Sequence, residues 1–142
     1  MTIKETAGKV LLYFYKLQRA TPLTMAHRQV GFIAKKEGGQ TLTSDKTWLS
    51  KDLQGINPVS SDVLNAFTFL LNKDFIESSE RVSANARIYV GIQLTDKGID
   101  IIEGIERDRD GKRSFELAFN IAVADDVDVE GLIKENLKML SD

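Results

Sequence analysis

The side chains of this chain that could do chemistry are one histidine, several groups of carboxylates and scattered neutral polar residues. Cysteine is absent. Without cysteine there is no disulfide framework, no cysteine-based zinc site and no thiol nucleophile. His27 is the single histidine, beside Arg28. A metal site or a serine triad needs partners arranged around such a residue, so we expect His27 to be a surface histidine on a helix.

Four acidic residues near the C-terminus, Asp125, Asp126, Asp128 and Glu130, could gather a hard cation such as Mg²⁺. They also crowd the start of a predicted last helix, where the helix dipole favours negative charge. No second carboxylate cluster is placed to complete a site. We therefore expect these residues to stabilise the helix end, and no metal is expected.

Residues 106–111 (ERDRDG) have acids at alternate positions before a glycine, as calcium loops do at their start. The pattern then fails, because its eighth position is Arg113 and its twelfth is Leu117 rather than a bidentate glutamate. The run is expected to be a helix end and a connecting turn. Since no phosphate-cradling glycine loop or nucleophile elbow occurs either, the sequence predicts neither an enzyme nor a cofactor.

The composition, 42% hydrophobic and 28% charged, is that of an ordinary soluble globular protein. The net charge of −2 hides an asymmetry: residues 1–94 have 12 Lys and Arg against 8 Asp and Glu, and residues 95–142 have 7 against 13. A mildly basic front and an acidic tail fit a nucleic-acid binder with a separate interaction segment. The apolar run from Val10 to Tyr15 is too short for a signal core or a membrane span, so we expect a cytoplasmic protein without membrane contact.

Helices dominate the first half of the chain. Apolar residues at helical spacing predict a helix over 4–18, and a less regular amphipathic helix runs from Met25 through Phe32 and Ile33 to the glycines at 38–39. Ser44 or Asp45 can begin a third helix that reaches Gln54, and residues 55–58 (GINP) form a turn. Ser60 or Ser61 then begins a longer helix that ends at Asn72.

Two strands and a closing helix follow. Phe75 and Ile76 start the first strand, residues 83–86 form the tip of a hairpin, and Ile88, Val90 and Ile92 alternate with other residues along the second strand. Thr95 can begin the closing helix by accepting a hydrogen bond from the N–H of Lys97 or Gly98. The inward residues of that helix are Ile99, Ile102 and Ile105.

The segment after Ile105 has a different pattern. Its apolar residues alternate strictly and predict a strand with one apolar face: Phe115, Leu117, Phe119, Ile121 and Val123. Asp128 can cap a last helix, whose apolar residues are Leu132, Ile133, Leu137 and Leu140. A lone strand and helix of this size are unstable alone, so the main domain or a second chain must cover the apolar face.

Part of the chain resembles the winged helix-turn-helix DNA-binding domains of bacterial regulators. The resemblance lies in the expected helices 44–54 and 60–72, in Phe75-Ile76, and in the sequence Leu94-Thr95-Asp96-Lys97-Gly98. In those domains a Leu-Thr-x-x-Gly step leads from the wing to the closing helix. Asp74 stands where glycine is common in the family. The resemblance covers roughly two fifths of the chain with short motifs.

The resemblance implies that helix 60–72 lies in the major groove and that the wing contacts the neighbouring backbone or minor groove. The expected base-reading residues are Ser60, Ser61, Asn65 and Thr68, and asparagine is suited to adenine because its amide both donates and accepts. The expected phosphate contacts are Lys73, Arg81, Arg87, Lys46 and Lys51.

We therefore expect a mainly helical α+β fold: a winged helix-turn-helix domain over residues 1–105 with a C-terminal strand–helix extension over 106–142. The helix-turn-helix is expected at about 44–73 and the wing at about 75–95. The expected function is transcriptional regulation by a dimer on double-stranded DNA. The tail would supply the homodimer contact, with Phe115, Leu117, Phe119 and Ile121 as interaction residues.

An alternative is a protein-interaction or assembly module that does not bind DNA. The predicted recognition helix has Asp62 near its start and contains no arginine, so it lacks the commonest reader of guanine. On a helical wheel Phe69 lies opposite Phe67 and Leu70, and an exposed phenylalanine suits a protein contact or cover by residues 25–36. The alternative therefore stays open.

Overall fold

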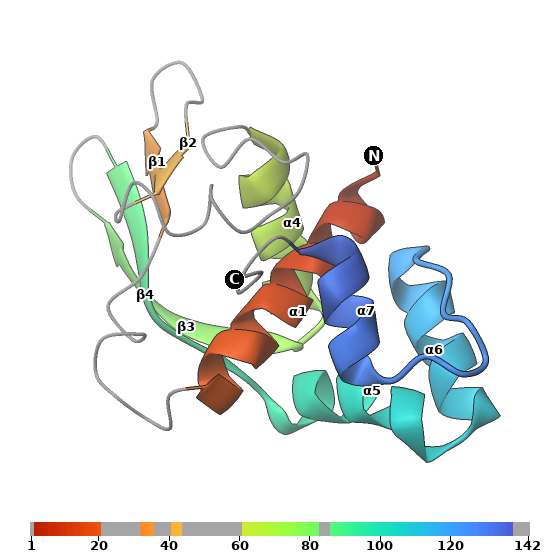
Figure 1. Ribbon diagram of the computed structural model, residues 1–142. Coiled ribbons are helices and arrows are strands. Elements are labelled where there is room, and N and C mark those ends of the chain that lie inside the picture. The colour runs from red at the N-terminus through yellow and green to blue at the C-terminus, as the bar shows by residue number, and fades with distance from the viewer. Residues whose placement is uncertain (1, 21–31, 36–40, 44–60, 83–85, 138–142) are drawn as a thin grey trace.

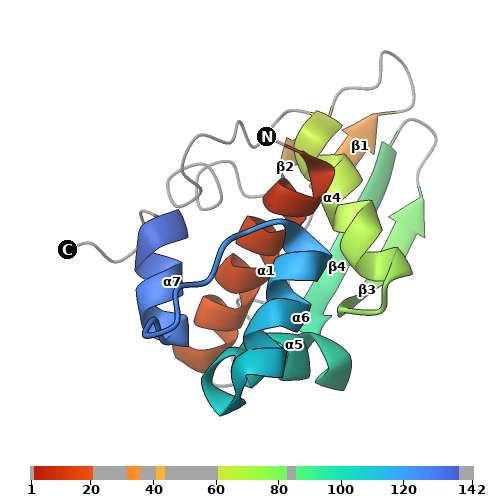
Figure 2. The same ribbon diagram turned by 90° about the vertical axis from the view of Figure 1, so that its right-hand side faces the viewer.

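The computed structural model describes residues 2–20, 32–35, 41–43, 61–82 and 86–137, and it is a mainly helical α+β fold (Figure 1). Its elements in chain order are α1 (Ile3–Ala20), β1 (Phe32–Lys35), β2 (Thr41–Thr43), α4 (Ser61–Asn72), β3 (Ile76–Val82), β4 (Ala86–Leu94), α5 (Asp96–Arg107), α6 (Arg109–Phe119) and α7 (Val129–Asn136). Helix α1 lies in the middle, with α4 and the sheet on one side and α5, α6 and α7 on the other (Figures 1 and 2).

Helix α1 begins with a reciprocal cap. The Thr2 hydroxyl accepts from the Glu5 N–H at 3.2 Å, and the Glu5 carboxylate accepts from the Thr2 N–H at 2.7 Å. Every residue from Val10 to Tyr15 is buried, so the middle of this helix is covered on all sides rather than on one stripe. The expected helix at 4–18 is confirmed, and its apolar run is the centre of the core. No helix in the described ranges is long and apolar enough to cross a membrane.

The described strands form an antiparallel sheet in the order β2-β1-β4-β3. Ile33 pairs with Leu42 on one side and with Ile88 on the other. The prediction of a helix through Phe32 and Ile33 is therefore wrong for these residues: β1 gains a backbone partner on both edges, and this long-range pairing outweighs a weak helical pattern. The expected hairpin between Ile76 and Leu94 is confirmed, and its ladder is irregular between Glu77 and Ser79.

Helix α4 ends in a left-handed turn at Asp74. Asp74 has φ 63°, its N–H donates to the Leu71 carbonyl at 3.1 Å, and the Phe75 N–H donates to the Leu70 carbonyl at 3.0 Å. These two bonds are those of a Schellman motif, which favours glycine at the left-handed position. An aspartate therefore occupies a position that glycine would fill with less strain.

The Leu94-Thr95-x-x-Gly98 sequence anchors α5 to this turn. The Thr95 hydroxyl accepts from the Gly98 N–H at 3.1 Å, which confirms the expected cap, and it also donates to the Asp74 carbonyl. A Cβ at Gly98 would lie 2.0 Å from the Phe75 carbonyl oxygen. The first turn of α5 can therefore approach the backbone of Phe75 only because residue 98 has no side chain.

The C-terminal segment differs from the expected strand. Residues 109–119 form helix α6, so the prediction of a strand through Phe115, Leu117 and Phe119 is wrong. Asp108 caps this helix by accepting from the Gly111 N–H at 2.7 Å, and Asn120 ends it in the left-handed region with φ 55°. The charged run at 106–113 is thus the end of one helix and the start of another, joined at Asp108.

The fold of the same chain covers most of the apolar residues of this segment, and Leu117 is the exception. Phe115 and Phe119 are fully buried, and a Cβ added at Gly8 of α1 would lie within 3 Å of both Phe119 and Ile121. Asp128 caps α7 as expected, by accepting from the Gly131 N–H at 2.7 Å, and the Glu106 carboxylate accepts from the Val129 N–H at 2.8 Å. Helices α6 and α7 therefore extend the core around α1.

Candidate nucleic-acid interface

The outward face of α4 is a stripe of neutral polar side chains. Asn65, Thr68 and Asn72 are all exposed, and their spacing places them on one side of the helix. Ala66, Phe67 and Leu70 are fully buried on the opposite side, where α4 packs against α1. A rigid helix thus presents amide and hydroxyl groups to solvent, and these groups can both donate and accept hydrogen bonds.

Asn72 was not among the residues predicted from the sequence. Its distance of seven residues from Asn65 is the signal that could have identified it, because two helical turns return a residue to the same side. The predicted base-reading residues Asn65 and Thr68 do lie on the exposed stripe. Ser61 is the first residue of α4. Ser60, Lys46 and Lys51 lie outside the described residues.

Phe69 is less exposed than the helical wheel indicates. It is half-buried and packs against the hydrophobic core, and the Lys73 ammonium lies 5.9 Å from the centroid of its ring. A cation at this distance over a ring is attracted to its face. The contact holds Lys73 beside the end of α4, where its exposed ammonium can reach an anionic ligand.

The two arginines predicted to contact phosphates lie near the end of the hairpin. Arg81 of β3 pairs with Ile88, and Arg87 of β4 pairs with Val82, so they belong to consecutive cross-strand pairs. The hairpin follows α4 after a turn of three residues. The polar face of α4 and the hairpin that contains Arg81 and Arg87 therefore belong to consecutive elements, and Lys73 lies in the turn between them.

Acidic side chains also occur at this junction. Asp74 and Glu77 are exposed, and Glu77 accepts a hydrogen bond from the side-chain amide of Gln93 on β4. Residues 61–94, which form α4 and the hairpin, have 3 Lys and Arg against 4 Asp and Glu, whereas residues 95–142, which form α5, α6 and α7 on the other side of α1, have 7 against 13. A polyanion would therefore meet the α4 and hairpin side of the molecule with less repulsion.

The four predicted interaction residues of the C-terminal segment are not brought together on one surface. Phe115 and Phe119 are fully buried, Ile121 is nearly so, and Leu117 is 69% exposed. Phe115 and Phe119 are four residues apart on α6 and face the core, whereas Leu117 lies on the other side of the helix. Three of the four side chains are therefore occupied within their own chain.

No acidic, histidine and cysteine cluster among the described residues could hold a metal ion. Of the four acids considered for Mg²⁺, Asp128 caps α7 and Glu130 pairs with Lys16 at 3.7 Å, while Asp125 and Asp126 are exposed. His27 lies outside the described residues.

Comparison with known proteins gives no relative: no family model matches the chain, and no curated protein or solved structure matches it significantly.

Proposed function

We propose that this protein binds double-stranded DNA through α4 and the β3-β4 hairpin, as a winged helix-turn-helix transcriptional regulator. The observation that carries the proposal is the exposed stripe of Asn65, Thr68 and Asn72 on a helix whose other face is buried. An α-helix fits the major groove, and amide side chains there pair with adenine through two hydrogen bonds.

The topology supports the same proposal. An antiparallel hairpin follows α4, a helix follows the hairpin, and β4 lies between β1 and β3 in the sheet. A helix, two strands and a closing helix in this order are the layout of the winged-helix family. The partner of α4 in the helix-turn-helix would be residues 44–54, which lie outside the described residues.

In the proposed mechanism, phosphate contacts set the position of the protein and base contacts set its specificity. Lys73, at the end of α4, and Arg81 and Arg87, on the hairpin, would neutralise phosphates on either side of one groove. Asn65 and Thr68 would contact base edges. The separate placement of these two groups means that affinity and specificity can be changed independently.

The test is a fluorescence titration of the whole chain against a random-sequence duplex pool at about 50 mM and about 200 mM salt. We expect binding that weakens with salt. The triple variant Lys73→Ala, Arg81→Ala, Arg87→Ala should bind at least about tenfold more weakly, with a shallower salt dependence, because each lost phosphate contact lowers the slope by about one. Arg113→Ala, which removes an exposed charge on α6, is the matched control and should bind normally.

Specificity is tested separately by selecting preferred duplexes from the same pool. The double variant Asn65→Ala, Thr68→Ala should keep salt-sensitive binding to the unselected pool and lose preference for the selected sequence, at about 1–3 kcal/mol for each lost base contact. If the folded wild-type chain shows no salt-sensitive binding at either salt concentration, the proposed function is wrong.

A protein-interaction module is the second candidate, and the partial exposure of Phe69 favours it. It makes a different prediction for the triple basic variant and a further one for Phe69. The triple basic variant would still bind its protein partner, whereas Phe69→Ala would weaken that binding. Because Phe69 also packs against the core, a Phe69→Leu variant is needed to separate a lost contact from a lost fold.

A further inference from the structure

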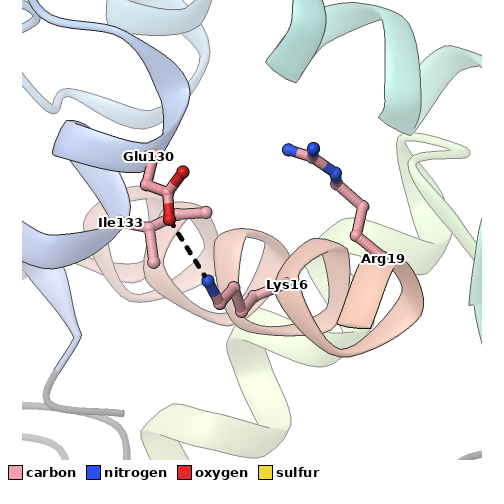
Figure 3. Close-up of a pocket in the computed structure, with 4 residues that line it drawn as sticks. All are labelled: Lys16, Arg19, Glu130 and Ile133. Carbon is pink, nitrogen blue, oxygen red and sulfur yellow. Dashed lines mark ion pairs between the residues drawn. The ribbon is translucent and has the colours of Figure 1, made fainter. Parts of the chain in front are cut away.

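A half-open hollow lies between the last two turns of α1 and the face of α7, away from the proposed DNA-binding elements. Its volume is about 180 Å³. Among the described residues it is lined by Lys16 and Arg19 of α1 and by Glu130 and Ile133 of α7. Lys16 points toward Glu130, and Arg19 comes from the end of α1, apart from this pair (Figure 3). The lining thus combines two cations, one carboxylate and an apolar side chain.

The ion pair in this hollow is weak. The Lys16 ammonium lies 3.7 Å from a Glu130 oxygen, and the Glu130 side chain is 60% exposed. A mostly solvated pair at this separation contributes little to stability, so a better placed anion can replace Glu130 as the partner of Lys16.

Arg19 has no carboxylate partner within salt-bridge distance in the part of the chain that the structure describes. Its guanidinium carbon lies 5.5 Å from the centroid of the Tyr15 ring, and the Tyr15 hydroxyl donates to Glu103 of α5 at 2.9 Å. The guanidinium is attracted to the face of the ring and also interacts with the Tyr15 hydroxyl, and its five N–H groups leave further donors for another acceptor. Lys16 and Arg19 are three residues apart on α1, so they are neighbours on the helix surface.

We propose that this hollow binds a small organic carboxylate. Its charged end would lie between Lys16 and Arg19, because a guanidinium binds both oxygens of a carboxylate. Its apolar part would face Ile133, the apolar residue among the described ones that line the hollow. A cavity of about 150 Å³ holds benzene in another protein, so this hollow is large enough for an aromatic carboxylate the size of benzoate.

Binding in this hollow would act on the wing through α1. Gln18 lies between the two cations in the sequence, and its side-chain oxygen accepts from the N–H of Leu94, the last residue of β4, at 3.1 Å. This coupling rests on the proposed DNA-binding function, whereas the binding of the carboxylate does not.

The experiment is a nuclear magnetic resonance titration of the whole chain with benzoate, and with neutral benzamide as the matched ligand. We expect saturable benzoate shifts at the Ile133 methyl groups and the Arg19 side chain. Benzamide should bind at least about tenfold more weakly, because it lacks the charge that the cations recognise. Arg19→Gln and Lys16→Met should each weaken benzoate binding about tenfold, and Arg113→Gln should leave it unchanged. Thermal unfolding of each variant checks that the chain is folded.

Several results would overturn the site. These are the absence of saturable benzoate shifts, equal binding of benzamide, equal binding by folded Arg19→Gln, or stronger binding of inorganic phosphate at the same residues. The last result would make the hollow an anion site without preference for carboxylates. A DNA titration with and without benzoate tests the coupling separately. If the chain binds benzoate and does not bind DNA, the proposed function is wrong and the carboxylate site stands.

Discussion

Asp74 and Asn120 are the non-glycine residues with positive φ among the described residues, and both end helices. Asn120 caps α6 with its N–H donating to the Glu116 carbonyl at 2.8 Å. Aspartate and asparagine tolerate the left-handed region better than other side chains do, yet glycine has no steric cost there. The backbone at Asp74 is therefore strained, and substitution by glycine should relieve this strain.

We expect Asp74→Gly to raise the free energy of unfolding by about 0.5–1 kcal/mol, because relief of the left-handed strain exceeds the extra entropy of glycine in the unfolded chain. Asp74→Ala should lower it, since alanine has the Cβ clash without the local hydrogen bonding of aspartate. Urea unfolding measures both. A destabilised Asp74→Gly variant would mean that the carboxylate makes a contact that stabilises the turn.

The surroundings of Tyr15 make its hydroxyl a weaker acid than that of a free tyrosine. Burial, and then the hydrogen bond to Glu103, raise its pKa from 10.0 to about 12. A raised folded-state pKa contributes stability that is complete below the unfolded pKa near 10 and is lost as the pH rises toward 12. Ultraviolet titration of tyrosinate should therefore show a late step near pH 12 that Tyr15→Phe removes. If the wild type completes its titration near pH 10, the Tyr15–Glu103 contact is absent in solution.

At the scale of elements, α6 shows how one pattern can predict two structures. Phe115, Phe119 and Val123 fit a period of two and a period of four equally well. Two signals distinguish them: Asp108 stands three residues before Gly111 as a cap, and Asn120 is a common helix end. Leu117 is exposed between the buried Phe115 and Phe119. This agrees with a helix, because a strand would place all three side chains on one face.

The helix predicts unequal effects of substitution at neighbouring apolar positions. Phe119→Ala should cost about 3–5 kcal/mol of stability, as truncation of a fully buried phenylalanine usually does. Leu117→Ser should change stability by no more than about 0.5 kcal/mol. Thermal or urea unfolding of the two variants compares them directly. Similar large losses at both positions would favour the strand that the alternating pattern suggests.

For the whole molecule, the C-terminal segment completes the core of one chain. The sequence alone suggested a dimer because an apolar strand face needed a cover, and α1 supplies that cover. We still propose a homodimer, as expected from the sequence, because helix-turn-helix regulators commonly bind two half-sites as dimers. Its surface must then differ from the buried face of Phe115 and Phe119.

We accordingly expect Leu117→Ser to leave the molar mass in solution unchanged, as measured by light scattering on wild type and variant at equal concentrations. One exposed leucine supplies far less than the roughly 800 Å² per partner that a stable interface buries. Conversion of a wild-type dimer to a 15.9 kDa monomer by this substitution would instead locate the interface on α6.

The sequence by itself determined the elements whose signals are local. Helices α1 and α4, the β3-β4 hairpin, and the caps at Thr95 and Asp128 follow from apolar spacing and from hydroxyl or carboxylate groups that can accept from free N–H groups. The exposed side chains Asn65 and Thr68 follow from the same helical spacing. Each of these features depends on residues within a few positions of one another.

Only the tertiary structure decided the features that depend on distant residues. Pairing with β2 and β4 makes β1 a strand. Packing against the core leaves Phe69 only half-exposed. Packing of Phe119 on α1 makes the expected tail strand the helix α6. The tertiary structure also joined Lys16 and Arg19 of α1 with Ile133 of α7 around one hollow. A local pattern cannot select among alternatives of similar local free energy, and the contacts that select among them come from parts of the chain far apart in sequence.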